Sequence, residues 1–259
     1  MTWSSKRQLL YLALFIVLIG ILGLLIIIPI INKPALCTDG KQNGDEVGID
    51  CGGSCTVFCS SQVSDVVVLW SRAFHVAGDR YNILAYIENQ NPAAEIKDIN
   101  YEFRLYDAEN KFIGLRDGHT SISPNGRAAI FEPGVNVGNK IPKTTLFKFT
   151  STPVWLKADL SVQNRAVLEV VDKQLEQTDI APRLTATIAN NTIYNVQNIE
   201  FAAIIYDEND NAVAVSKTYL DAVPKNSKRE IFFTWNEPLT GSVFKTEIIP
   251  KFDPTGVTF

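Results

Sequence analysis

The stretch EIKDINYEFRLYDAEN, Glu95–Asn110, alternates apolar and polar residues through its centre. The side chains at positions 99, 101, 103 and 105 are apolar, and those at positions 100, 102 and 104 are polar or charged. Successive side chains of an extended strand point to opposite faces of a sheet, so a period of two indicates a strand with one buried face and one wet face. The stretch therefore predicts an antiparallel sheet that is half exposed to water.

A second stretch about one hundred residues downstream repeats this pattern, and that period is close to the size of one β-sandwich domain. It is NVQNIEFAAIIYDEND, Asn195–Asp210, in which the isoleucine, tyrosine and aspartate of the first stretch recur. Upstream, AYIENQN at Ala85–Asn91 matches ATIANNT at Ala186–Thr192. The match extends over two whole segments, which predicts a duplicated domain.

Turn-forming clusters separate the short strands of both segments, among them ENQNPAAE, SPNG and PGVNVGN, without an intervening amphipathic helix. This arrangement is typical of antiparallel sandwiches rather than of βαβ units. We therefore predict an all-β fold with two tandem immunoglobulin-like β-sandwich domains, residues 63–163 and 164–259. The link around Ser161–Arg165 has no glycine or proline, so the two sandwiches should abut as a semi-rigid rod.

Both segments resemble the FxLYD domain family, an immunoglobulin-like sandwich of extracytoplasmic proteins. The motif is complete in FRLYD at 103–107, whereas AIIYD at 203–207 keeps only its Tyr-Asp end. An asparagine precedes each strand at the turn where the family has one. The resemblance implies neither a reaction nor a fixed ligand. It implies structural roles for Asn89, Phe103, Leu105, Tyr106, Asp107, Asn190, Tyr206 and Asp207.

The apolar run at Leu9–Ile31 contains no charged residue and is long enough to cross a hydrocarbon core of about 30 Å as a helix. Lys6 and Arg7 precede it, so the positive-inside rule places residues 1–8 in the cytoplasm and the remainder outside. The run is longer than the apolar region of a cleaved signal peptide. We predict an uncleaved, single-pass signal anchor in the cell membrane.

Four cysteines, Cys37, Cys51, Cys55 and Cys59, lie in the segment 32–62 that follows the apolar run. Cysteines exported to an oxidising compartment usually pair, so two structural disulfides are expected, with three connectivities left open. The C-x13-C-x3-C-x3-C spacing differs from that of paired zinc knuckles. We expect no metal and no cofactor.

The same segment is rich in oxygen ligands and glycines, which leaves calcium binding open as an alternative. It does not contain the EF-hand pattern, and the favoured interpretation is a turn-rich loop in which acidic and amide side chains cap their own backbone. The alternative function is therefore a calcium-dependent adhesion or ligand-binding module. Its candidate ligands would be Asp39, Asn43, Asp45, Glu46 and Asp50.

The pattern C-x-DG-x-x-NGDE-x-x-x-DCGG-x-C-x-x-x-C also resembles a short cysteine-rich motif of extracellular bacterial proteins. The resemblance covers Cys37–Cys59 alone. It implies export and a bacterial source, and it implies no activity.

Catalytic and nucleic-acid functions find little support in the composition. The net charge is −4, with 24 basic and 28 acidic residues spread along the chain, so no basic stripe for nucleic acid occurs. Only two histidines are present. His119 is near Asp117, Ser121 and Ser123, and an envelope hydrolase is the remaining alternative. We expect no catalytic residue, and buried rather than exposed roles for Trp70, Trp155 and Trp235.

Together these patterns predict a non-catalytic, membrane-anchored extracytoplasmic protein. It would display two immunoglobulin-like domains for binding, assembly or envelope structure. Its expected partners are the membrane and a protein or envelope component whose identity the sequence leaves open.

Overall fold

The computed structural model describes residues 3–31, 36–159, 168–239, 241–252 and 257–258. One long helix, α1 (Trp3–Ile31), begins the chain. Among the described residues it is the one helix long and apolar enough to cross a membrane, and none of its apolar window at Gln8–Ile28 is buried by protein. Length and composition suit a membrane anchor or a signal sequence.

The described chain divides into two compact units, residues 1–62 and 63–259. The first contains α1, the cysteine-rich segment and the short 3-10 helix η1 (Ser60–Gln62). The second contains the strands. In the first half of the second unit the strands are β1 (Val67–Ala77), β2 (Arg80–Asn89), β3 (Ala94–Tyr106), β4 (Phe112–Ile122), β5 (Gly126–Asn136), β6 (Thr144–Phe149) and β7 (Leu156–Lys157).

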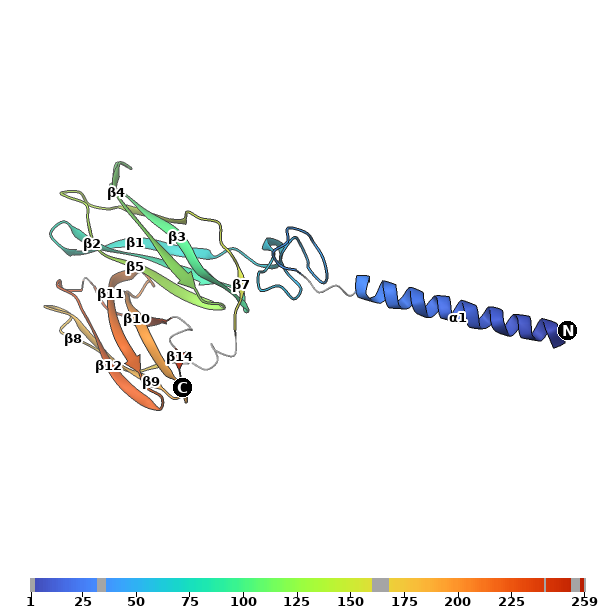
Figure 1. Ribbon diagram of the computed structural model, residues 1–259. Coiled ribbons are helices and arrows are strands. Elements are labelled where there is room, and N and C mark those ends of the chain that lie inside the picture. The colour runs from blue at the N-terminus through green and yellow to red at the C-terminus, as the bar shows by residue number, and fades with distance from the viewer. Residues whose placement is uncertain (1–2, 32–35, 160–167, 240, 253–256, 259) are drawn as a thin grey trace. The chain divides into compact units, whose positions relative to one another are not determined.

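These strands form a sandwich of two antiparallel sheets (Figure 1). One sheet has the order β1-β2-β5, and the other has the order β4-β3-β6, with β7 paired to the start of β3. The stretch that alternates in the sequence is β3. Its apolar side chains Phe103 and Leu105 are fully buried, opposite Ile83 and Ile87 of β2, which are buried as well.

The second half of the unit pairs its strands in the same order. Its sheets are β12-β9-β8 and β11-β10-β13, with β14 paired to the start of β10. These strands are β8 (Leu168–Glu176), β9 (Arg183–Asn190), β10 (Asn195–Tyr206), β11 (Ala212–Val223), β12 (Ser227–Thr234), β13 (Lys245–Lys251) and β14 (Val257–Thr258). The prediction of an all-β fold with two tandem sandwiches is confirmed; the boundary at residues 163 and 164 and the link at 161–165 lie outside the described residues.

The β3–β4 and β10–β11 hairpins turn at matching positions. Asn110 and Asp210 adopt φ values of 58° and 57°, in the left-handed region that Asn and Asp tolerate better than most residues. The motif aspartate of each half begins this turn: the Asp107 N–H donates to the Lys111 carbonyl, and the Asp207 N–H to the Asn211 carbonyl. The same local sequence therefore produces the same hairpin twice.

The second sandwich has its own apolar core. Leu184 and Ile188 from β9 pack with Phe201 from β10 and Phe233 from β12, and all four are almost completely buried. This core lies between the two sheets, as the period-two pattern requires, because residues 199, 201 and 203 share one face of β10. Each half thus buries the face that the alternation predicted.

A further buried cluster joins the two sandwiches. Leu84 and Tyr86 of β2 pack with Ile204 and Tyr206 of β10 and with Val215 of β11. These residues lie on the faces opposite to the sandwich cores, so sheet β1-β2-β5 packs against sheet β11-β10-β13. The semi-rigid rod expected from the sequence is wrong, because the sandwiches meet face to face through an apolar layer.

Candidate functional site

The outer face of β10, which joins the sandwiches, is apolar, whereas the matching outer face of β3 in the first half is charged. On β3, Glu102 pairs with Arg104 at 2.7 Å, and the Arg104 side chain is 46% exposed. The matching positions of β10 are Ala202 and Ile204, which are 6% and 0% exposed. Both faces of β10 are therefore apolar. The continuous run FAAIIY at 201–206 is the sequence signal for a strand covered on two sides.

A partly buried carboxylate, that of Glu247, lies at the edge of this shared layer. The Tyr86 hydroxyl donates a hydrogen bond to Glu247 Oε1 at 2.7 Å, and the Tyr206 hydroxyl donates to Glu247 Oε2 at 3.0 Å. Burial and the neighbouring Glu247 carboxylate raise the pKa of both tyrosines well above its ordinary value. Both hydroxyls therefore remain protonated donors. Two donors from different sandwiches satisfy one acidic group, which fixes the relative position of the sheets.

An ion pair links the sandwiches at the margin of the shared layer. His75 of β1 contacts Glu237, which follows β12, with 2.9 Å between Nδ1 and Oε2. His75 Nε2 lies 2.8 Å from the Gly78 carbonyl oxygen. The hydrogen bond to Glu237 and the one to Gly78 raise the pKa of His75. The sequence analysis did not identify Glu237, Glu247 or Tyr86, because the contacts between the sandwiches, His75 to Glu237 and Tyr86 to Glu247, join residues more than one hundred and fifty positions apart.

Asn89 and Asn190, assigned structural roles by the family resemblance, occupy matching places. The Asn89 Nδ2 donates to the Ala94 and Ser123 carbonyls, and its Oδ1 accepts from the Asn91 N–H. The Asn190 Nδ2 donates to the Tyr194 and Val223 carbonyls. Both side chains are buried, so each amide substitutes for missing backbone partners where the chain passes between sheets.

The two motif aspartates close hairpins. Asp107 Oδ1 accepts hydrogen bonds from the backbone N–H groups of residues 109 and 111. Asp207 Oδ1 accepts the equivalent bonds from residues 209 and 211. The bonds from Asn211 and Asn209 hold the pKa of Asp207 below its ordinary value. Tyr106 is partly exposed beside Phe112, whereas Tyr206 is buried in the shared layer.

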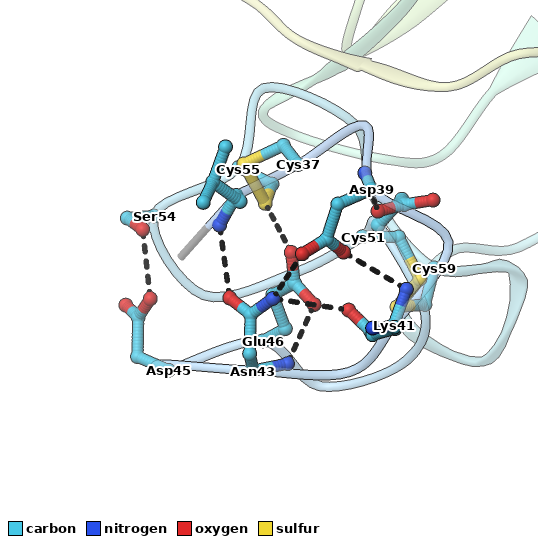
Figure 2. The surroundings of a disulfide bond; sticks show 12 residues. Cys37, Asp39, Lys41, Asn43, Asp45, Glu46, Cys51, Ser54, Cys55 and Cys59 are labelled. Atoms are coloured by element: carbon cyan, nitrogen blue, oxygen red, sulfur yellow. Dashed lines mark hydrogen bonds between the residues drawn. A yellow bond between two sulfur atoms is a disulfide. The ribbon is translucent and has the colours of Figure 1, made fainter. Parts of the chain in front are cut away.

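The cysteine-rich segment contains two interlocked disulfides, Cys37–Cys55 and Cys51–Cys59 (Figure 2). They span 18 and 8 residues, and one begins inside the loop that the other closes. The backbone between them is tightly packed: a Cβ added at Gly53 would lie 2.0 Å from the Asp45 carbonyl oxygen. The expected disulfides are present, and the structure selects one of the three connectivities.

The acidic and amide side chains of this segment bond its own backbone. The Asp50 carboxylate accepts from the N–H groups of Asp39 and Gly40 at 2.9 to 3.1 Å. Asp39 accepts from the Lys41 N–H and the Asn43 Nδ2, and Glu46 accepts from the Asn43 N–H (Figure 2). These bonds are those of the capped, turn-rich loop that the sequence analysis favoured over a calcium site.

Glu46 also reaches the disulfide. Its Oε1 lies 3.4 Å from the Cys55 sulfur, and Cys37, Glu46 and Cys55 bring their ligand-type atoms within 4.8 Å of one another. Both sulfurs belong to the Cys37–Cys55 bond, so neither is a thiolate that can ligate a metal. Asp45 is separate from this group and accepts from the Ser54 hydroxyl at 2.7 Å.

The histidine considered for hydrolysis has a different partner from the one its sequence neighbourhood suggested. His119 Nδ1 lies 2.9 Å from Asp98 Oδ1, across the β3–β4 pair, and both side chains are at least 70% exposed. Asp117 is on the same strand as His119 and pairs in register with Glu102 of β3.

Among the tryptophans considered, Trp155 is buried, and Trp70 and Trp235 are partly buried against the apolar clusters.

Comparisons with known proteins identify no family for this chain. No protein-family model and no curated protein matches the sequence, so the FxLYD family and the cysteine motif remain resemblances. Among solved structures, red sea bream transglutaminase is 9% identical with a TM-score of 0.27, covering 73% of this chain and 29% of that one. Bacteroides uniformis beta-glucuronidase 2 is 13% identical with a TM-score of 0.24, covering 68% and 25%.

A third solved structure is calcium binding domain CBD12 of CALX1.1, which is 13% identical with a TM-score of 0.22. Here 67% of this chain and 74% of that one are covered. The chain spans less than a third of the transglutaminase and of the glucuronidase. Similarities of this size indicate neither a ligand nor a reaction.

Proposed function

We propose that this protein is a single-pass membrane protein that displays two packed, immunoglobulin-like sandwiches on the outside of a bacterial cell. Its role there is non-catalytic, in binding, assembly or envelope structure. The FxLYD resemblance, the cysteine motif and the matching strand order of the two halves support a duplicated extracytoplasmic domain. The face-to-face layer would make the pair one rigid body rather than two mobile modules.

The observation that carries the proposal is the position of the disulfides. Cys37 follows the end of α1 by only a few residues, and all four cysteines of the chain are paired. Disulfides persist in oxidising compartments and are rare in the cytosol. The segment after α1 would therefore lie outside, while Lys6 and Arg7 would hold the N-terminus inside. Two independent signals favour the same orientation.

A labelling experiment tests this orientation in intact cells. A new cysteine is introduced at an exposed turn position, Glu109→Cys, or before the helix, Ser5→Cys, and cells are treated with a membrane-impermeant maleimide. We expect labelling of Glu109→Cys in intact cells and of Ser5→Cys only after permeabilisation. The native chain, with its cysteines paired, is the unlabelled control. The reverse pattern, or labelling of the native chain before reduction, contradicts the proposal.

The calcium alternative has a separate measurement. Hydrogen exchange of residues 36–62 is recorded in millimolar calcium and in chelator. We expect no difference, because Asp39, Asp50 and Glu46 already accept hydrogen bonds from the segment itself. Slower exchange in calcium, reversed by Asp50→Asn, would instead assign these oxygens to an ion.

A further inference from the structure

A cavity of about 230 Å³ lies between the two sandwiches, beside the shared apolar layer. Its walls come from β1, β2 and β11 and from the segment 234–239 that follows β12. Phe74 and Val215 belong both to the shared layer and to the cavity wall. The cavity is therefore formed only when the two sandwiches are packed together.

One side of this cavity is apolar and fixed in position. Trp235 lines it, and its indole N–H donates to the Val215 carbonyl at 3.1 Å, which holds the ring against β11. Phe74 and Val215 are 9% and 1% exposed. This side offers an aromatic ring and aliphatic carbon, which suit the C–H face of a small ring.

The other side carries hydrogen-bonding groups of both kinds. Glu237 contacts His75 through Oε2, which leaves Oε1 as an acceptor. The Asn82 Oδ1 accepts from the Gly134 N–H at 3.0 Å, so its amide also has donor groups. Asn236 completes the lining, and within the described residues its side chain makes no hydrogen bond. When His75 is protonated, it and Glu237 form an ion pair that leaves the wall with little net charge.

These features select a class of ligand by its chemistry. A charged ligand would need an unpaired opposite charge, and a purely apolar one would displace water from Glu237 Oε1 and from the amide groups without replacing its hydrogen bonds. A pyranose has hydroxyls that both donate and accept around an apolar ring face. The volume is below the range of about 300 to 1,000 Å³ usual for drug-sized ligands. We propose that this cavity binds a single neutral sugar unit, an inference that rests on the proposed role of the sandwiches in binding.

The test uses the full chain in phospholipid nanodiscs, since detergents with sugar headgroups would compete. Saturation-transfer NMR is recorded with three free monosaccharides, D-glucose, D-galactose and N-acetyl-D-glucosamine. We expect saturation transfer to at least one of them, with a dissociation constant in the millimolar range. Both faces of a nanodisc are accessible, so the result does not depend on membrane orientation, and a failed topology experiment remains distinguishable from a failed binding experiment.

Two variants place the ligand in the cavity. Glu237→Gln should weaken binding roughly tenfold, because it replaces a hydrogen bond to a charged oxygen by a weaker one to a neutral amide oxygen. Asn236→Ala should weaken it several-fold without altering the fold. The matched control is Asp98→Asn, which removes a carboxylate paired at the same 2.9 Å distance with the exposed His119 and should leave binding unchanged. Melting temperatures verify that each variant is folded.

Each result of these binding measurements either supports or overturns the proposal. Weaker binding in Glu237→Gln and in Asn236→Ala, with native affinity in Asp98→Asn, supports the proposal. No saturation transfer to any of the three sugars overturns it. Binding that both cavity variants leave unchanged also overturns it, because the sugar would then occupy another site.

Discussion

Replacing Ile204 by alanine should destabilise the pair of sandwiches far more than the equivalent change in the first half. Ile204 is completely buried in the layer between the sandwiches. Its counterpart on β3 is Arg104, on a face that water reaches. Positions 104 and 204 occupy equivalent places in the matching strands β3 and β10. They differ in what covers their side chains.

The magnitude follows from burial. Ile204→Ala removes three buried carbons, which at about 0.8 kcal/mol per methylene is about 2.4 kcal/mol of transfer free energy. The packed sheets on both sides leave little room for collapse, so a cavity contribution should raise the loss to about 3–4 kcal/mol, within the range of about 2–5 kcal/mol known for such changes. Arg104→Ala should leave the unfolding midpoint unchanged, because its side chain is on an exposed face.

Urea unfolding of the full chain in nanodiscs, followed by tryptophan fluorescence, measures both effects. With a denaturant slope of about 3 kcal/mol per molar, the Ile204→Ala midpoint should fall by about 1 M. Trp70 packs on the shared layer and Trp235 on the second core, so tryptophan fluorescence reports on both sandwiches, and we expect them to unfold in one transition. A loss below about 1 kcal/mol, or an equal loss in Arg104→Ala, would refute the reasoning.

Three further outcomes are expected. The raised pKa of His75 means that its pair with Glu237 stabilises the fold fully below the unfolded value of about 6.5 and loses that effect as pH rises through the folded pKa. His75→Gln should therefore lower the melting temperature more at about pH 5.5 than at about pH 8, and equal losses would contradict this. Asn190→Ala removes the side-chain donor of the buried Val223 carbonyl and one of two side-chain donors of the Tyr194 carbonyl, and should cost about 2 kcal/mol by urea unfolding, whereas a cost under about 1 kcal/mol would show that water replaces the amide. Cys55→Ser should remove about 2–4 kcal/mol of local stability, seen as faster hydrogen exchange in residues 36–62 with an unchanged midpoint for the sandwiches, and unaffected exchange would contradict the role of the Cys37–Cys55 bond.

Local information was sufficient to predict the strands, the helix and the turns. Alternation at 99–105 identifies the core face of β3, because side chains of a strand point alternately to its two sides. The aspartates at 107 and 207 cap turns through neighbours two and four residues away, which any chain with that local sequence can do. An uncharged run longer than a bilayer core is helical for an equally local reason, since its backbone must satisfy itself.

Which disulfides form depended on the path of the segment in space. Four cysteines in sequence order allow three pairings, and the separations between them do not select one. The Asp39 and Gly40 N–H groups donate to the Asp50 carboxylate, and in the folded segment Cys37 lies beside Cys55 rather than beside Cys51. The number of residues between two cysteines does not show how the chain between them folds.

The association of the two sandwiches was likewise decided by tertiary structure. The run FAAIIY shows that β10 is covered on both sides, but it does not name the covering surface. That surface is the outer face of β2, more than one hundred residues earlier, where Leu84 and Tyr86 complete the layer. At the edge of this layer, tyrosine hydroxyls from the two sandwiches donate to the two oxygens of the partly buried Glu247. The sequence by itself determined the apolar helix, the strands and their buried faces. Packing between distant strands decided the shared layer and the cavity beside it, because such contacts join residues that no local pattern relates.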